Sequence, residues 1–303
     1  MRTLDKQLDT TSQSEQQGNG STPADLAITT AQRSPRRALA SSLLLQVRDI
    51  ATGSLPALVL LAVLLALWQW YASQSFVDAL LLPTPLAVWQ TLLAQRDILW
   101  HHSGVTLYET LVGFGSALAT GVALAVLIDF SPWLRRALYP LLVTSQTIPI
   151  ITLAPLLVLW FGYQLTSKVI VVTLICFFPI AVALADGLRS ADPDLINLYR
   201  TFGAGPLRIF WSVRLPGALP SLFSGIRIAI TYSVVGAIFG EYVGANEGLG
   251  FYIQLKQHSL STAGVMATVA VTAVLSVALF LLTVLIERLA LPWYYIQGRQ
   301  SAA

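Results

Sequence analysis

Six long apolar blocks, separated by shorter polar stretches, constrain the fold of this chain more than any other feature of its sequence. Of its 303 residues, 55% are hydrophobic and 11% are charged, and the mean hydropathy is +0.68. Soluble domains carry about 25% charged residues. Apolar blocks of this length indicate membrane spans, and in lipid the backbone polar groups must be bonded within the chain. We therefore predict an all-α polytopic membrane protein.

The blocks predict six transmembrane helices of roughly 20 residues each. They are Leu55–Tyr71, Val105–Ile128, Ala137–Trp160, Val169–Gly187, Ser221–Phe239 and Ala263–Ile286. The third holds three prolines, so we expect it to be kinked. The segment Ala72–Gly104 is expected outside the membrane, as a short surface helix beginning near Pro85.

The basic residues predict how the spans are oriented, because cytoplasmic loops carry an excess of Lys and Arg. With the N-terminus inside, only Arg96, Lys168 and Lys256 of the 18 basic residues fall outside. Both termini and the 188–220 loop are then cytoplasmic. The resulting division is a disordered tail (1–48), a transmembrane domain (49–295) and a short cytoplasmic tail (296–303).

The 188–220 loop carries strong helix signals. Asp192 is a good N-cap and Pro193 suits the first helical position. Leu195, Leu198, Tyr199 and Phe202 then share one helical face, and Gly203 is a natural helix stop. We expect a second short helix from Pro206, ending at Leu215-Pro216, with Pro220 opening the next span. Two interpretations fit such amphipathic helices: docking against another protein, or resting on lipid headgroups through their arginines.

The loop also resembles a known signature. Permease subunits of bacterial ATP-binding-cassette importers carry Glu-Ala-Ala, three residues, Gly, nine residues and Ile-x-Leu-Pro. Here Gly203 is followed by nine residues and then Val213-Arg214-Leu215-Pro216, whereas Asn197-Leu198-Tyr199 replaces Glu-Ala-Ala. The contact made by the usual glutamate is therefore not carried over.

Other segments extend the resemblance over residues 50–295, toward the branch that carries sulfonates, taurine, nitrate and related solutes. They are LLPTP (81–85), TLYETLVGF (106–114), PLLVLWFGY (155–163), SGIRIAI (224–230), GEYVGANEGLG (240–250) and ERLALPW (287–293).

The resemblance implies a type I importer permease fold in a bacterial inner membrane, working as a homodimer with cytoplasmic ATP-binding subunits and an extracytoplasmic solute-binding protein. Segment 194–203 would be the coupling helix. The residues expected to contact the ATPase are Asp194, Leu195, Asn197, Leu198, Tyr199, Arg200, Phe202, Gly203, Ala204, Leu215 and Pro216. The chain has no phosphate-binding loop, so ATP would be bound by the partner. No cofactor, metal, catalytic residue or nucleic acid is expected.

The substrate is constrained less well. No Lys or Arg lies in the middle of a predicted span, and segment 145–180 resembles permeases for vitamins and their heterocyclic precursors. A vitamin or precursor, either riboflavin or the thiamine pyrimidine precursor, is the first expectation, and sulfonate, taurine or nitrate is the alternative. Uncharged polar residues that could line the path are Gln146, Thr147 and Tyr232, and Glu241 is added as an ionisable candidate.

Ionisable residues inside spans cost about 2.5–3.5 kcal/mol each at the bilayer centre. Glu109, Asp129, Asp186 and Glu241 lie near span ends, and we expect each to be structural rather than functional. Stripes of small residues predict close helix packing, either within the chain or, for the fifth span, at a dimer centre. They are Gly113, Ala117 and Gly121 in the second span and Gly225, Ala229, Ser233 and Ala237 in the fifth.

Two other classes of protein compete. An intramembrane serine protease needs a Ser and a His at matching depth, but His101, His102 and His258 all fall in predicted outer segments. A secondary carrier more often shows an internal repeat, and none is visible here. The single cysteine, Cys176, excludes an internal disulfide and is expected to be a small buried side chain.

Overall fold

The computed structural model describes residues 56, 57, 59–74, 78, 80–292 and 294. Both predicted tails, 1–48 and 296–303, lie outside these residues. The chain divides into two units, Met1–Ala66 and Leu67–Ala303, each of which is described by itself. The described residues of the first unit are helical, and the first predicted span corresponds to the apolar helix Val59–Ala72.

The described residues of the second unit form helices and no strand, which confirms the all-α prediction. The helices are α2 (Pro85–Ala94), α3 (Arg96–Phe130), α4 (Pro132–Ser145), α5 (Ile150–Phe161), α6 (Leu165–Arg189), α7 (Pro193–Thr201), α8 (Pro206–Ile209), a π-helical turn (Phe210–Arg214), α9 (Leu215–Gly244), α10 (Leu249–His258) and α11 (Thr262–Ala290).

Three helices start with the same N-terminal sequence pattern, an N-cap side chain followed by proline. The side chains of Thr84, Ser131 and Asp192 accept hydrogen bonds from backbone N–H groups of the first turns of α2, α4 and α7. The proline that follows removes no hydrogen bond there, because the first N–H of a helix has no intrahelical partner. The predicted starts near Pro85 and at Pro193 are confirmed.

Within the described residues, four helices are long and apolar enough to cross a membrane: Arg96–Phe130, Leu165–Arg189, Pro206–Gly244 and Thr262–Ala290. Helix α3 begins at Arg96, before the second predicted span at Val105, so part of the segment expected to lie outside the membrane belongs to the same helix as that span. Its first turns are held by tertiary contacts: Leu99 is buried against Leu249 and Tyr252 of α10. Such contacts were invisible in the local sequence.

The third predicted span is two helices rather than one kinked helix. Helix α4 ends at Ser145 and α5 begins at Ile150, with Pro149 between them in extended conformation. Pro140 and Pro155 remain inside their helices. Pro149 has no N–H to bond to the carbonyl of Ser145, and its ring restricts the residue before it, so α4 cannot continue through this proline and ends before it.

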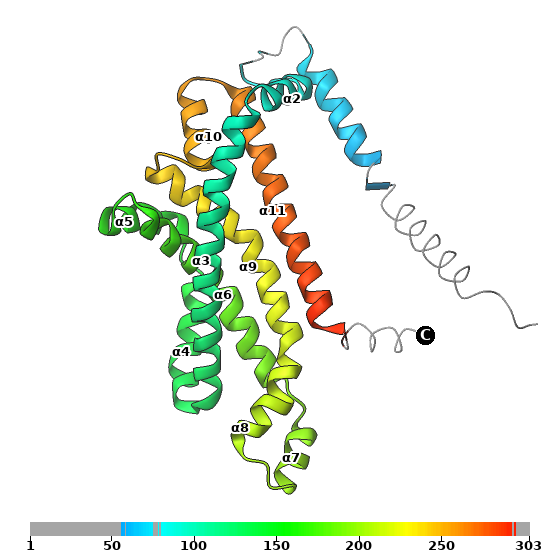
Figure 1. The fold of residues 1–303 in the computed structure, drawn as a ribbon, viewed down its shortest axis with the longest axis vertical. Helices are drawn as coiled ribbons and strands as arrows, with labels where there is room; N and C mark the ends of the chain where they lie inside the picture. Colours follow the sequence, from blue (N-terminus) through cyan, green and yellow to red (C-terminus); the bar gives the residue numbers. More distant parts are fainter. Residues whose placement is uncertain (1–55, 58, 75–77, 79, 293, 295–303) are drawn as a thin grey trace, which may run out of the picture. The chain divides into compact units, whose positions relative to one another are not determined.

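Helix α6 packs against α3 on one side and α9 on another, and it also contacts α5 (Figure 1). Ala117 of α3, Cys176 of α6 and Ala229 of α9 are all fully buried in the cluster that joins these helices. The thiol of Cys176 donates to the Ala229 carbonyl oxygen at 3.2 Å, and its expected burial is confirmed.

Both small-residue stripes pack within the chain, as one of the two interpretations predicted. A Cβ atom on Gly113 would lie 2.5 Å from Cβ of Val172, and one on Gly225 would lie 2.7 Å from the carbonyl oxygen of Pro179. Both neighbours belong to α6. The stripes of α3 and α9 therefore let the two helices approach α6 closely.

The predicted helix end at Leu215-Pro216 is wrong. Residues 206–244 run on as one helical rod, and Pro220 lies inside α9 instead of opening it. A wide π-helical turn, Phe210–Arg214, precedes Pro216, and the N–H of Leu215 bonds to the carbonyl of Phe210, five residues back. In a regular α-helix the ring of Pro216 would clash with the carbonyl of Ser212, and the wider turn accommodates it.

Candidate functional site

Helix α7 stands at one end of the bundle, beyond the ends of α6 and α9 (Figure 1). Asp192 caps its start: the side chain accepts the N–H of Asp194 at 2.8 Å. Gly203 ends it with a positive φ of 76°. The N–H of Gly203 bonds to Arg200 O at 2.9 Å, and that of Ala204 bonds to Tyr199 O at 3.0 Å, a Schellman motif. Residues next to α7 in the sequence therefore cap the helix at both ends.

No residue of α7 is fully buried by the rest of the described chain. Leu195, Leu198 and Phe202 are 46%, 49% and 81% exposed. Of the predicted apolar face, only Tyr199 is half-buried, and Asn197 is exposed on another face. Large exposed apolar side chains that cluster on one short helix mark a surface for another protein or for a membrane. This exposure fits both interpretations of the loop, docking against another protein and resting on lipid headgroups.

An ion-pair cluster lies at the base of the α7 loop. The carboxylate of Asp129, at the end of α3, accepts bonds from Nη1 of Arg214 at 3.0 and 2.8 Å. It also accepts a bond from Nη2 of Arg135 on α4 at 3.1 Å. The side chain of Asp129 is 3% exposed. Three segments, α3, α4 and the turn before α9, are thereby tied together, in agreement with the structural role expected for Asp129.

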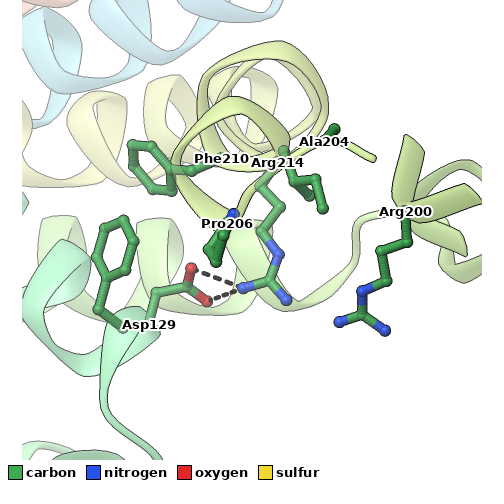
Figure 2. Close-up of a pocket in the computed structure, with 8 residues that line it drawn as sticks. Asp129, Arg200, Ala204, Pro206, Phe210 and Arg214 are labelled. Carbon is green, nitrogen blue, oxygen red and sulfur yellow. Dashed lines mark hydrogen bonds and ion pairs between the residues drawn. The ribbon is translucent and has the colours of Figure 1, made fainter. Parts of the chain in front are cut away.

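A cavity of about 260 Å³ opens between this cluster and the α7 loop. Its lining residues are Asp129, Phe130, Arg200, Ala204, Pro206, Ile209, Phe210 and Arg214. Figure 2 shows the guanidinium groups of Arg214, bonded to Asp129, and of Arg200, which comes from α7. Of the eleven predicted ATPase-contact residues, Arg200 and Ala204 line this cavity. Leu215 and Pro216 are half-buried at the start of α9, away from the exposed face of α7.

The opposite end of the bundle holds a second buried polar network. Nζ of Lys168 lies 2.5 Å from Oε1 of Glu109, and both side chains are less than 10% exposed. Lys168, predicted to lie on the outer side of the membrane, is buried between α3 and α6. The sequence analysis did not predict that Glu109 is its partner. Two oppositely charged residues near the same ends of two packed spans could have indicated this ion pair.

Glu241, a pathway candidate, is fully enclosed in the same region. Its Oε1 lies 2.6 Å from Oγ1 of Thr106, and its Oε2 accepts the N–H of Gly250 at 2.6 Å. Nδ1 of His102 accepts the N–H of Gly248 at 3.1 Å. These bonds fasten the turn before α10 to α3, so Glu241 acts here as a structural anchor.

The other pathway candidates are not gathered into a site. Gln146 and Thr147 are exposed in the turn between α4 and α5, and Tyr232 is 52% exposed on α9. No group of three or more His, Cys, Asp or Glu residues in the described part of the chain is placed to hold a metal ion.

Comparisons with known proteins agree with this architecture. The profile of the family described as "Binding-protein-dependent transport system inner membrane component" matches residues 117–292. A probable ABC transporter permease of Haemophilus influenzae is 43% identical, covering 65% of this chain and 80% of that protein. The formylaminopyrimidine transport permease ThiX of Halalkalibacterium halodurans is 37% identical, covering 76% and 92%.

More distant relatives bear other substrate names. The riboflavin transport permease RibX of Chloroflexus aurantiacus is 36% identical, covering 82% of this chain and 94% of that protein. The taurine transport permease TauC of Escherichia coli is 31% identical, covering 77% and 88%. Among solved structures, the inward-facing MetNI methionine ABC transporter matches with a TM-score of 0.54 at 23% identity, covering 60% of this chain and 91% of that one. This match supports the fold.

Proposed function

This chain belongs to the family of binding-protein-dependent transport system inner membrane components, and from that premise we propose that it carries a vitamin or vitamin precursor into the cell. It is a multi-pass permease subunit of an ATP-binding-cassette importer, not an enzyme. The substrate proposal is based mainly on sequence identity to named relatives. The permeases named for formylaminopyrimidine and riboflavin are 37% and 36% identical to this chain, whereas the taurine permease is 31% identical.

The charges inside the described spans support an uncharged heterocycle over a sulfonate. Lys168 is held by Glu109 at 2.5 Å, and Nε of Arg227 lies 3.4 Å from Oε2 of Glu287. A cation already paired in low dielectric offers little attraction to a second anion. Riboflavin and the thiamine pyrimidine precursor remain equal candidates.

We propose further that α7 is the coupling helix and faces the cytoplasm, where it docks on an ATP-binding subunit. Its capped ends and exposed face of Leu195, Leu198 and Phe202 suit a rigid helix that lies in a groove. Two copies of the permease would form the pathway, with the ATP-binding subunits inside and a solute-binding protein outside. Both termini would then be cytoplasmic.

The test is uptake into vesicles that contain this chain with its ATP-binding and solute-binding partners. Labelled riboflavin, formylaminopyrimidine and taurine are each offered with and without ATP. We expect ATP-dependent uptake of riboflavin or formylaminopyrimidine, and little of taurine. ATP-dependent uptake of taurine alone would replace the vitamin proposal by the sulfonate alternative. Uptake that needs no ATP would instead indicate a secondary carrier.

A further inference from the structure

Positive charge is in excess around the cavity at the base of the α7 loop. Arg135 and Arg214 share one carboxylate, that of Asp129, and Arg200 adds a third guanidinium group at the cavity wall. Across the described residues, Arg200 has no carboxylate within ion-pair distance. The cluster therefore keeps about two uncompensated positive charges, a setting that attracts an anion.

Arg214 also has hydrogen-bond donors to spare. Both of its bonds to Asp129 come from Nη1, at 3.0 and 2.8 Å. Its Nη2 makes no hydrogen bond to the described residues and keeps accessible surface. A guanidinium group has five N–H donors. A ligand in the cavity with several acceptor oxygens would accept hydrogen bonds from the Nη2 donors that the protein itself leaves open.

The remaining walls suit a ligand at a membrane surface. Phe130, Pro206, Ile209 and Phe210 supply apolar lining to the cavity. Figure 2 labels Pro206 and Phe210 beside the Asp129–Arg214 pair. The cavity lies where α3 ends and the long rod 206–244 begins, so it sits at the ends of two spans. Basic pockets at span ends are places where phosphate-bearing headgroups bind.

We propose that this cavity binds a phosphate group, with Arg200 and Arg214 as its ligands. Arginine is the residue best matched to phosphate, because its planar fork can donate two parallel hydrogen bonds. The phosphate belongs either to an anionic lipid headgroup or to free inorganic phosphate. Arg200 comes from the last turn of α7 and Arg214 from the turn before α9, so the bound group ties the loop to the transmembrane rod. The site is independent of the solute transported.

The experiment measures binding to the purified transporter complex, with the ATP-binding subunits present. Phosphatidylglycerol is titrated and followed by native mass spectrometry, and labelled inorganic phosphate is followed by equilibrium dialysis. The variants are Arg200→Gln, which removes a ligand, and Ala204→Leu, which fills the cavity without a change of charge. Arg208→Gln is the matched control, because Arg208 is exposed on the same loop and does not line the cavity.

We expect saturable binding of one or both probes, weakened about tenfold or more by Arg200→Gln, as for loss of a charge-assisted hydrogen bond. Ala204→Leu should weaken it as well, whereas Arg208→Gln should keep it within about twofold. If only the lipid binds saturably, the bound phosphate belongs to a lipid headgroup. If only inorganic phosphate binds saturably, the bound group is a free ion. The proposal is overturned if neither probe saturates, as when an acidic side chain of the ATP-binding subunit fills the cavity. It is equally overturned if Arg208→Gln weakens binding as much as Arg200→Gln.

Discussion

Replacing Lys168 by methionine is expected to lower the free energy of unfolding of this permease by about 3–5 kcal/mol, the usual cost of removing one partner from a buried ion pair. The structure makes the upper part of this range reasonable. Glu109 is 3% exposed, and Nζ of Lys168 lies 2.5 Å from its Oε1. Oε2 of Glu109 makes no hydrogen bond to the described residues. Methionine keeps most of the length of the lysine stem, so little of the loss comes from a new cavity.

A double-variant cycle separates this charge effect from a packing effect. Glu109→Met alone should also destabilise the fold, because it leaves the ammonium group buried and unpaired. The Glu109→Met/Lys168→Met double variant should return to within about 1 kcal/mol of the original chain, since a buried pair can be replaced by apolar groups at little cost. The free energy of unfolding is measured by loss of helical circular dichroism in mixed micelles with increasing sodium dodecyl sulfate.

Two results would refute this reasoning. Either single variant could prove destabilised by less than about 1 kcal/mol, which would mean that water or lipid headgroups already solvate the pair. Alternatively, the losses of the two single variants could simply add in the double variant, which would show that the side chains do not interact. Gly115→Ala is the control for a harmless substitution in the same helix α3, because a Cβ added there meets no described atom within 4 Å. Its free energy of unfolding should stay close to that of the original chain.

Three further changes test the loop and the packing. Gly203→Arg should leave the chain folded in the membrane but abolish ATP-driven uptake. A Cβ added at Gly203 meets no described atom within 4 Å, but the positive φ of 76° strains any residue other than glycine, so the end of α7 and the proposed docking surface are both disturbed. Normal uptake would contradict the docking role. Phe202→Ala removes an 81% exposed ring. It should weaken co-purification of the ATP-binding subunit about tenfold or more, without a shift in the melting temperature of the permease. Unchanged co-purification would argue against contact at this ring. Gly225→Leu should lower the melting temperature, since its Cβ would lie 2.7 Å from a backbone oxygen of α6. Gly217→Ala, where a Cβ meets no described atom within 4 Å, should change the free energy of unfolding by about 1 kcal/mol or less. Equal effects of the two variants would contradict the close packing of α9 on α6.

Local signals gave reliable predictions where the physical cause is itself local. The caps at Thr84 and Asp192, the prolines that follow them, and Gly203 with its positive φ each act within a few residues. The exposed face of α7 was likewise readable from helical spacing. The predictions failed where a distant contact overrides a local preference. Helix α3 extends back to Arg96 because α10 covers Leu99, and the rod 206–244 passes Pro216 through a wide turn.

The pairing of the buried charges that lie far apart in sequence needed the tertiary structure. Asp129 and Arg214 are 85 positions apart, and Glu109 and Lys168 are 59 apart. Sequence showed that such residues near span ends must be compensated, because burial of a lone charge is too costly, but it did not show by which partner. It also placed Glu241 among pathway candidates, although a turn 9 residues later encloses it.

The sequence by itself determined that the chain is a helical membrane protein with a capped, exposed loop helix, because apolar block length and capping chemistry are properties of consecutive residues. Its loop spacing was also enough to indicate the importer family. Only the tertiary structure decided which small faces meet α6, which carboxylate holds which cation, and that two arginines from separate segments share one cavity. Those outcomes depend on helices that approach one another across many residues of intervening chain, and that proximity is not written in any single segment.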